Sequence, residues 1–167
     1  ATSGGSTTDD GTTSAPAGIE HPTGPRDVVV RVETGGGFVA ATYALRTMPS
    51  FTLYGDGTAI VTGPVTEIYP GPAVTPLRTF HLDEAGIQSL LASAKAAGLL
   101  GGTIAYGDMG AIGIADAATT TVTLVADGTT HEHAAYALGM DTPGVHGELA
   151  AARKRLSRWL ETLPATG

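Results

Sequence analysis

The sequence predicts an α+β domain: an antiparallel sheet of hairpins with two amphipathic helices packed on one face. Apolar residues alternate near residues 27–33 and 119–138, which indicates strands. Short turns rich in Gly and Asp join strand-like runs. Two further stretches keep the apolar spacing of helices that pack on a sheet. The resulting order of strands, helix, hairpin and helix is typical of an antiparallel sheet covered by helices.

Residues 1–25 are mostly Ser, Thr, Gly, Pro and Ala, with Ile19 as their single large aliphatic residue. Such a segment buries too little apolar surface to offset the entropy lost on ordering. We therefore expect a flexible tether over residues 1–25 and a single domain over residues 26–167. Small polar tails commonly follow the lipidated Cys of bacterial lipoproteins. We expect an extracytoplasmic protein that is anchored to the envelope through a lipidated Cys upstream of Ala1. The alternative is that the given sequence starts at an arbitrary point.

The balance of charge excludes several classes of function. The chain of 167 residues carries 16 acidic and 9 basic residues, has no Cys, and contains no long basic run. Nucleic-acid binding is therefore not expected, and thiol chemistry is excluded. No stretch approaches the roughly 20 apolar residues of a spanning helix, so membrane contact is expected through a lipid anchor alone. We interpret four basic residues that lie close together as the solvated face of a helix: Arg153, Lys154, Arg155 and Arg158. The alternative is that they contact an anionic membrane or an acidic partner.

The first strands follow from alternation and turn chemistry. Val28, Val30 and Val32 alternate with charged residues and predict a half-buried strand over 27–33. A second short strand can follow over 38–43. Gly55-Asp56-Gly57 then predicts a three-residue hairpin loop, which pairs Leu53 with Ala59 and Phe51 with Val61.

The middle of the chain contains an irregular connection and then a helix. Four Pro residues between 63 and 76 cannot donate to an interior ladder and indicate an irregular or edge segment. Extended structure resumes over 78–82. Asp83 is a predicted N-cap for a helix over 84–97, and Gly98 offers a left-handed stop. The last helix is predicted to start at Thr142-Pro143 and to keep one apolar stripe until Pro164.

The late hairpin, with strands around Asp127-Gly128, contains His131 and His133, which are two residues apart and share one face. A strict two-residue turn pairs Val122 with His133 and places both imidazoles among apolar neighbours. A one-residue bulge at Gly128 places both imidazoles on the exposed face, but it turns Glu132 toward the apolar face. We favour the bulge, because it gathers more apolar residues on one side. His131 and His133 are then candidate metal ligands. The more common alternative is that two such histidines are exposed polar residues that bind no ligand.

A stretch rich in Gly and small residues runs from 101 to 118, and such long loops are often functional. Its distinctive side chains are Tyr106, Asp108 and Asp116, which we take as candidate binding residues. The two Asp residues lack the alternating spacing of a calcium loop, so a role in turns is favoured for them.

Three motifs carry a family resemblance: Phe51-Thr-Leu-Tyr54-Gly55-Asp56-Gly57, the helix end Ala97-Gly98-Leu99-Leu100, and Asp116-Ala-Ala-Thr-Thr120 before a strand. Together they resemble a family of uncharacterised exported bacterial domains, many of them similar to lipoproteins. The resemblance covers residues from about 38 to 138. It implies an envelope location and an α+β fold, and it implies no known activity or ligand.

The sequence contains no recognisable catalytic motif or phosphate loop, so we expect a non-catalytic protein without a cofactor. The leading hypothesis is a tethered module that binds a protein or another envelope component. The alternatives are a metal-binding module that uses His131 and His133, and an exported inhibitor whose 101–118 loop inserts into an extracellular enzyme.

Overall fold

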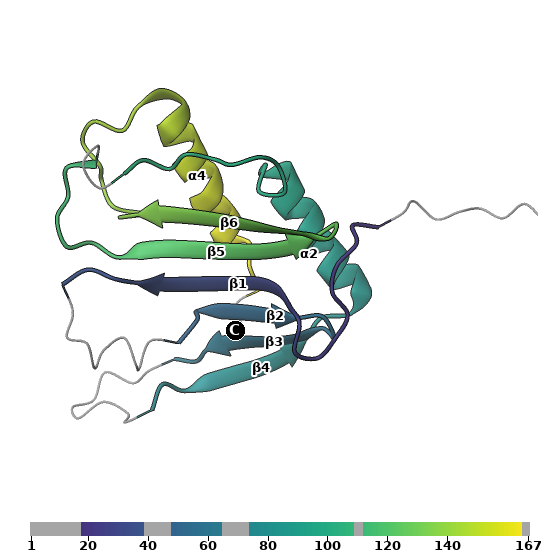
Figure 1. The fold of residues 1–167 in the computed structure, drawn as a ribbon. Coiled ribbons are helices and arrows are strands. Elements are labelled where there is room, and N and C mark those ends of the chain that lie inside the picture. Colours follow the sequence, from purple (N-terminus) through teal and green to yellow (C-terminus); the bar gives the residue numbers. More distant parts are fainter. Residues whose placement is uncertain (1–17, 39–47, 65–73, 109–111, 165–167) are drawn as a thin grey trace, which may run out of the picture.

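A single antiparallel sheet dominates the fold. The computed structural model describes residues 18–38, 48–64, 74–108 and 112–164. Within these residues the strands pair in the order β4-β3-β2-β1-β5-β6 (Figure 1). The α+β class and the antiparallel sheet are therefore confirmed. The strands are β1 (Val28–Gly35), β2 (Phe51–Tyr54), β3 (Thr58–Thr62), β4 (Leu77–His81), β5 (Thr119–Ala126) and β6 (Thr129–Tyr136).

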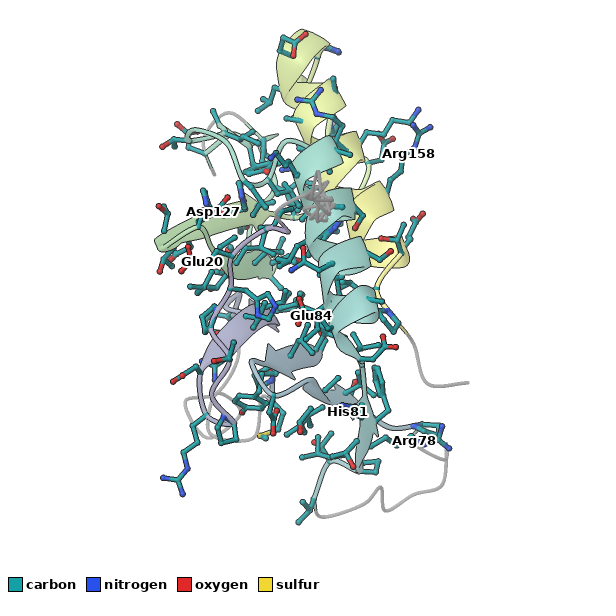
Figure 2. The ribbon with its side chains drawn as sticks, turned by 90° about the vertical axis from the view of Figure 1, so that its right-hand side faces the viewer. Glu20, Arg78, His81, Glu84, Asp127 and Arg158 are labelled. Atoms are coloured by element: carbon teal, nitrogen blue, oxygen red, sulfur yellow. The ribbon has the colours of Figure 1, made fainter. Side chains whose placement is uncertain are left out.

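Two helices, α2 (Glu84–Ala96) and α4 (Gly147–Glu161), lie on the same side of the sheet (Figures 1 and 2). Their apolar stripes meet the inner face of the strands and exclude water from it, which is the main favourable contribution to folding. The core joins side chains from five strands and both helices, among them Val30, Leu53, Ala59, Leu124, Ala135, Leu91 and Leu156.

The start of α2 agrees with the sequence prediction, whereas the start of α4 does not. The Asp83 side chain accepts a hydrogen bond from the Gly86 N–H at 2.8 Å and caps α2. The predicted start of α4 at Thr142-Pro143 is wrong. Gly144 has a φ of 87°, a conformation that interrupts a right-handed helix, and α4 begins only at Gly147.

The two β-hairpins differ in how well their register could be predicted. In the β2–β3 hairpin Leu53 pairs with Ala59 and Phe51 with Val61, as the Gly-Asp-Gly turn indicates. In the β5–β6 hairpin Val122 pairs with His133, so the favoured bulge is wrong and both histidines are on the inner face. Asp127 and Gly128 form the two-residue turn with φ of 49° and 68°, the positive values that a type I′ turn requires.

The tight turn at Asp127-Gly128 is supported by hydrogen bonds to a residue distant in sequence, and it keeps Glu132 out of the core. The Asp127 carboxylate accepts the Glu20 N–H at 3.1 Å, and the Asp127 N–H donates to the Glu20 carbonyl at 2.8 Å. These bonds support a left-handed conformation that is otherwise unfavourable for a residue with a Cβ atom. The two-residue register also leaves Glu132 exposed, so the carboxylate of this strand stays out of the core.

The predicted boundary of the tether at residue 25 needs correction. Residues 18–25, which we call the strap, pack on the domain. The Ile19 N–H and carbonyl bond to the Gln88 side chain, and Ile19 packs against the core. Residues 1–17 lie outside the described residues, as do residues 39–43 of the predicted second strand. Phe38 is described, exposed and outside any strand.

Candidate functional site

His133 is a buried member of a polar network. His133 is 3% exposed. Its Nε2 lies 2.9 Å from the Leu99 carbonyl, and its Nδ1 lies 3.1 Å from the Tyr106 hydroxyl. Because a carbonyl can only accept, Nε2 carries the proton and Nδ1 accepts from Tyr106. Both ring nitrogens are thus occupied in a neutral ring, and a metal ion would have to displace one of these partners. His131 lies on the same face and is half-buried.

Tyr106, predicted to be a binding residue, is instead part of the core. It is 3% exposed, and its ring meets the His133 ring edge-on, with centroids 5.7 Å apart and an interplanar angle of 85°. Burial raises the pKa of Tyr106 to about 12, since a phenolate would lose its hydration. Tyr106 therefore remains a hydroxyl donor at physiological pH.

Arg153 is the buried charged residue that the sequence analysis missed. It is 5% exposed and donates to three main-chain carbonyls, those of Tyr106 at 3.0 Å, Tyr136 at 2.9 Å and Ala137 at 2.8 Å. Burial lowers the pKa of Arg153 because it penalises the charged form. The interpretation of this residue as part of a solvated face is wrong. The available signal was its position four residues after Leu149 and three before Leu156, within the apolar stripe.

Asp108 and Asp116 are both exposed and belong to turns. Asp116 has a φ of 58°, and its carbonyl lies against Gly37, where an added Cβ would come within 2.7 Å of that oxygen. The Asp108 carbonyl accepts from the Ile112 N–H at 3.2 Å. Of the predicted site residues, Tyr106 and His133 contact each other. The described part of the chain brings no three His, Asp or Glu side chains into a cluster suited to a metal ion.

A groove runs along one side of α4. It consists of three adjoining hollows of about 390, 350 and 260 Å³. Leu138 and Ser157 border the first two hollows, and Leu160 and Leu163 border the last two. We call this surface the α4 groove. Its other wall comes from strand residues and the segment after β6, including Val32, Phe51, Val61, Met140 and Val145.

Basic side chains border the α4 groove on a protein whose formal net charge is −7. Lys154 lines the first hollow, and Arg158 extends from α4 on the side away from the sheet (Figure 2). The two residues are four apart and are therefore neighbours on the helix surface, where like charges repel. Neither forms an ion pair with another described residue. Asp141 and Glu161 also line the groove, so both signs of charge are present.

No protein-family model, curated protein or solved structure matches the chain. Within the described ranges, neither helix combines the length and the apolar character that crossing a bilayer requires. The fold and the site thus define an α+β domain with an open antiparallel sheet, a closed polar network beneath its helices, and a groove of mixed polar and apolar lining beside α4.

Proposed function

We propose that this protein is an exported binding module that receives an amphipathic helix of a protein partner in the α4 groove. The observation that carries the proposal is the continuity of the three hollows, which share Leu138, Ser157, Leu160 and Leu163. Ligand sites are typically concave, largely apolar and supplied with a few polar groups. The α4 groove is concave and combines apolar side chains such as Leu138, Leu160 and Leu163 with polar and charged ones such as Ser157 and Lys154.

The spacing of the groove favours a helical partner. Lys154 and Glu161 lie about 10 Å apart along the axis of α4, which is two helical turns. An amphipathic helix with apolar anchors at positions i, i+4 and i+7 spans a similar distance and is a common ligand for such grooves. A carboxylate of that helix would pair with Lys154, which lines the first hollow. This charge complementarity favours an acidic partner segment.

Attachment to the envelope is a further part of the proposal. The small polar residues of positions 1–25 support a lipidated Cys upstream of Ala1. Binding of the partner would then take place at the membrane surface, with the domain held by its N-terminal chain. The intact mass of the native protein tests this, and it should include a diacylated or triacylated Cys before Ala1. An unmodified native protein recovered from the medium would contradict the anchor.

Site-specific photo-crosslinking in the native host tests the groove. A benzoylphenylalanine at position 157, between the first two hollows, should give one discrete adduct. The same probe at Ser89, an exposed position on α2, is the matched control and should give none. The charge reversal K154E should remove the adduct, whereas K95E at the exposed end of α2 should not. Equal adducts from positions 157 and 89 would contradict a binding groove.

A further inference from the structure

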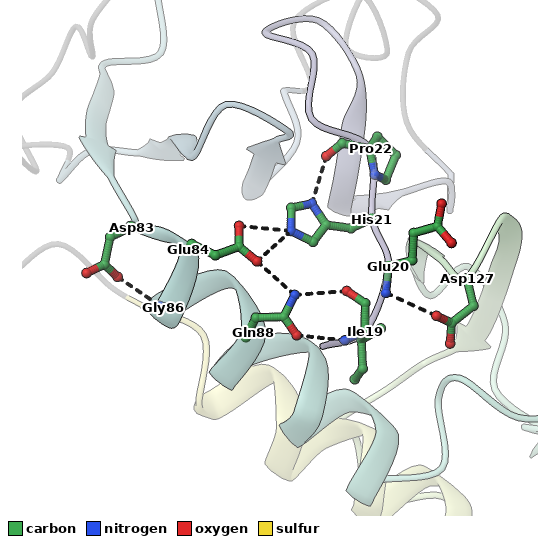
Figure 3. Close-up of polar contacts among 9 residues, drawn as sticks. All are labelled: Ile19, Glu20, His21, Pro22, Asp83, Glu84, Gly86, Gln88 and Asp127. Carbon is green, nitrogen blue, oxygen red and sulfur yellow. Dashed lines mark hydrogen bonds and ion pairs between the residues drawn. The ribbon is translucent and has the colours of Figure 1, made fainter. Parts of the chain in front are cut away.

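The strap is held to the domain by two reciprocal pairs of hydrogen bonds (Figure 3). The Gln88 amide accepts from the Ile19 N–H at 2.8 Å and donates to the Ile19 carbonyl at 2.9 Å. Glu20 and Asp127 form the second pair, at 3.1 and 2.8 Å. Together they place His21, the next residue, beside the first turn of α2.

The partners of His21 are both hydrogen-bond acceptors. Its Nδ1 lies 2.7 Å from the Pro22 carbonyl, which requires an N–H at that position. Its Nε2 faces both oxygens of the Glu84 carboxylate, each at 3.3 Å. In a neutral ring Nε2 would present a lone pair to this carboxylate. Only the doubly protonated imidazolium satisfies both partners, and its side chain is 4% exposed, so water has little access to replace either one.

We propose that His21 is a proton-controlled latch, which holds the strap to α2 while the ring is charged and weakens that contact when the ring loses its Nε2 proton. Histidine is the side chain whose ordinary charge change falls between pH 5 and 8. A modest change in external pH therefore changes how firmly the strap is docked. This inference is independent of the α4 groove.

The charged groups around the latch are mostly acidic. Glu84 is its direct partner, and hydrogen bonds from Gln88 and then His21 hold the pKa of Glu84 below its usual range. Asp83 on α2, Asp127 on the β5–β6 turn and Asp56 on the β2–β3 turn are the other carboxylates on packed elements, and Glu20 and Asp27 belong to the strap region. Of the basic residues, Arg26 follows the strap directly in the sequence, and His81 is the last residue of β4 (Figure 2).

The sign of the pH dependence follows from the two charges. The contact needs the imidazolium, so it is present while Nε2 is protonated and is weakened when a rise in pH removes that proton. It also needs the Glu84 carboxylate, so it is lost again when pH falls through the lowered pKa of Glu84. The latch is therefore strongest in mildly acidic solution.

Release of the strap would change the reach of the domain. Residues 18–25 run along the edge of α2 and the β-turns while they are docked. When released, eight extended residues add at most about 26 Å between the chain that precedes them and β1. The latch thereby couples proton concentration to the freedom of the folded domain on its N-terminal chain.

Amide hydrogen exchange of the full chain, measured by NMR at pH 5.5 and pH 8.0 and corrected for the intrinsic rates, tests the latch. The reporting amides are Ile19, which donates to Gln88, and Asp127, which donates to Glu20. Their protection factors should fall about threefold at pH 8.0, the size expected for a partly exposed ion pair. The Leu99 amide, bonded to the Ala94 carbonyl at the far end of α2, is the control and should not change.

Two variants decide whether His21 is responsible. In E84Q the new carboxamide can donate to the unprotonated Nε2, so protection of Ile19 and Asp127 should be retained at pH 8.0. In H21Q no ring titrates, and protection should be equal at both pH values. The proposal is overturned if the wild type shows the same protection at both pH values, or if H21Q keeps the threefold fall. The Leu99 amide reports in each variant that the domain is folded.

Discussion

The rings of His133 and His21 both have little access to water, yet their hydrogen-bond partners differ in kind. His133 has one donor, the Tyr106 hydroxyl, and one acceptor, the Leu99 carbonyl, which together fit a neutral ring. His21 has a carbonyl and a carboxylate, which fit a charged ring. Burial alone therefore does not determine the charge of these residues. The chemistry of the partners assigns His133 to the permanent core and His21 to a contact that depends on pH.

The surroundings of the two rings differ in the same sense. Next to His133, Arg153 donates to three main-chain carbonyls and joins α4 to the segment around Tyr106 and to the end of β6. Next to His21, the Glu84 side chain is 68% exposed and is in contact with water. Charge-assisted bonds are stronger when they are buried, because water screens them less. We therefore expect the region around His133 to make a large contribution to the free energy of unfolding at every pH. The region around His21 should make a small contribution that changes with pH.

The largest expected effect is at Arg153. The substitution R153M removes the donors of three buried carbonyls while retaining a long apolar stem. Each unsatisfied group costs about 1–3 kcal/mol, so the free energy of unfolding should fall by about 3–5 kcal/mol. Urea denaturation measures this. The matched control R155M, at an exposed position of the same helix, should change stability by less than about 0.5 kcal/mol. A cost of R153M as small as that of R155M would show that the network contributes little.

A smaller effect is expected from the late hairpin. H133A leaves the Tyr106 hydroxyl and the Leu99 carbonyl without a partner and creates a cavity, so it should cost about 2–3 kcal/mol. H131A removes a half-buried ring at the neighbouring inward position and should cost less than about 1 kcal/mol. The loss of stability in each variant, measured by thermal denaturation, distinguishes between the two possible registers of this hairpin. Equal, small costs would be evidence for the exposed register that the sequence alone favoured.

The smallest expected effect occurs at alkaline pH and comes from Tyr106. The pKa of Tyr106 is about 12 in the folded protein, above its ordinary value near 10. The unfolded chain therefore releases this proton first, and stability is lost as pH rises through this interval. The loss from Tyr106 should be about 1.4 kcal/mol at pH 11. Comparison of urea midpoints at pH 9 and pH 11 should show this loss in the wild type and not in Y106F. An identical pH dependence in Y106F would assign it to other groups.

Local signals predicted much of the fold. The Gly-Asp-Gly turn specified the β2–β3 register, because its three-residue loop leaves one way to gather Phe51 and Val61 on the same face. Asp83 and the spacing from Ile87 to Ala94 specified α2. In β1 the alternation was correct for Val30 and Val32. A bulge between Val28 and Val30 also turns Val29 into the core, and no pattern in the sequence indicated it.

The site was less predictable, since its residues meet through contacts distant in sequence. The sequence presented His131 and His133 as a pair on one face, which is correct, and left the choice of face to a turn that allowed two registers. The turn that is present is supported by Glu20, which is 107 residues from its partner Asp127. The same limit applies to the strap. Its composition predicts disorder, whereas Gln88, 69 residues away, supplies the hydrogen bonds that its backbone needs.

By itself, the sequence determined the α+β class, the order of the described elements, the cap of α2 and the turn residues of this protein, because these depend on neighbours within a few positions. Only the tertiary structure decided that Arg153 is buried, that His133 lies between the Tyr106 hydroxyl and the Leu99 carbonyl, and that His21 faces a carboxylate. The physical reason is that a polar side chain can be buried only where donors and acceptors are supplied to it. For these three residues the decisive partners are, respectively, 17, 27 and 63 positions away along the chain.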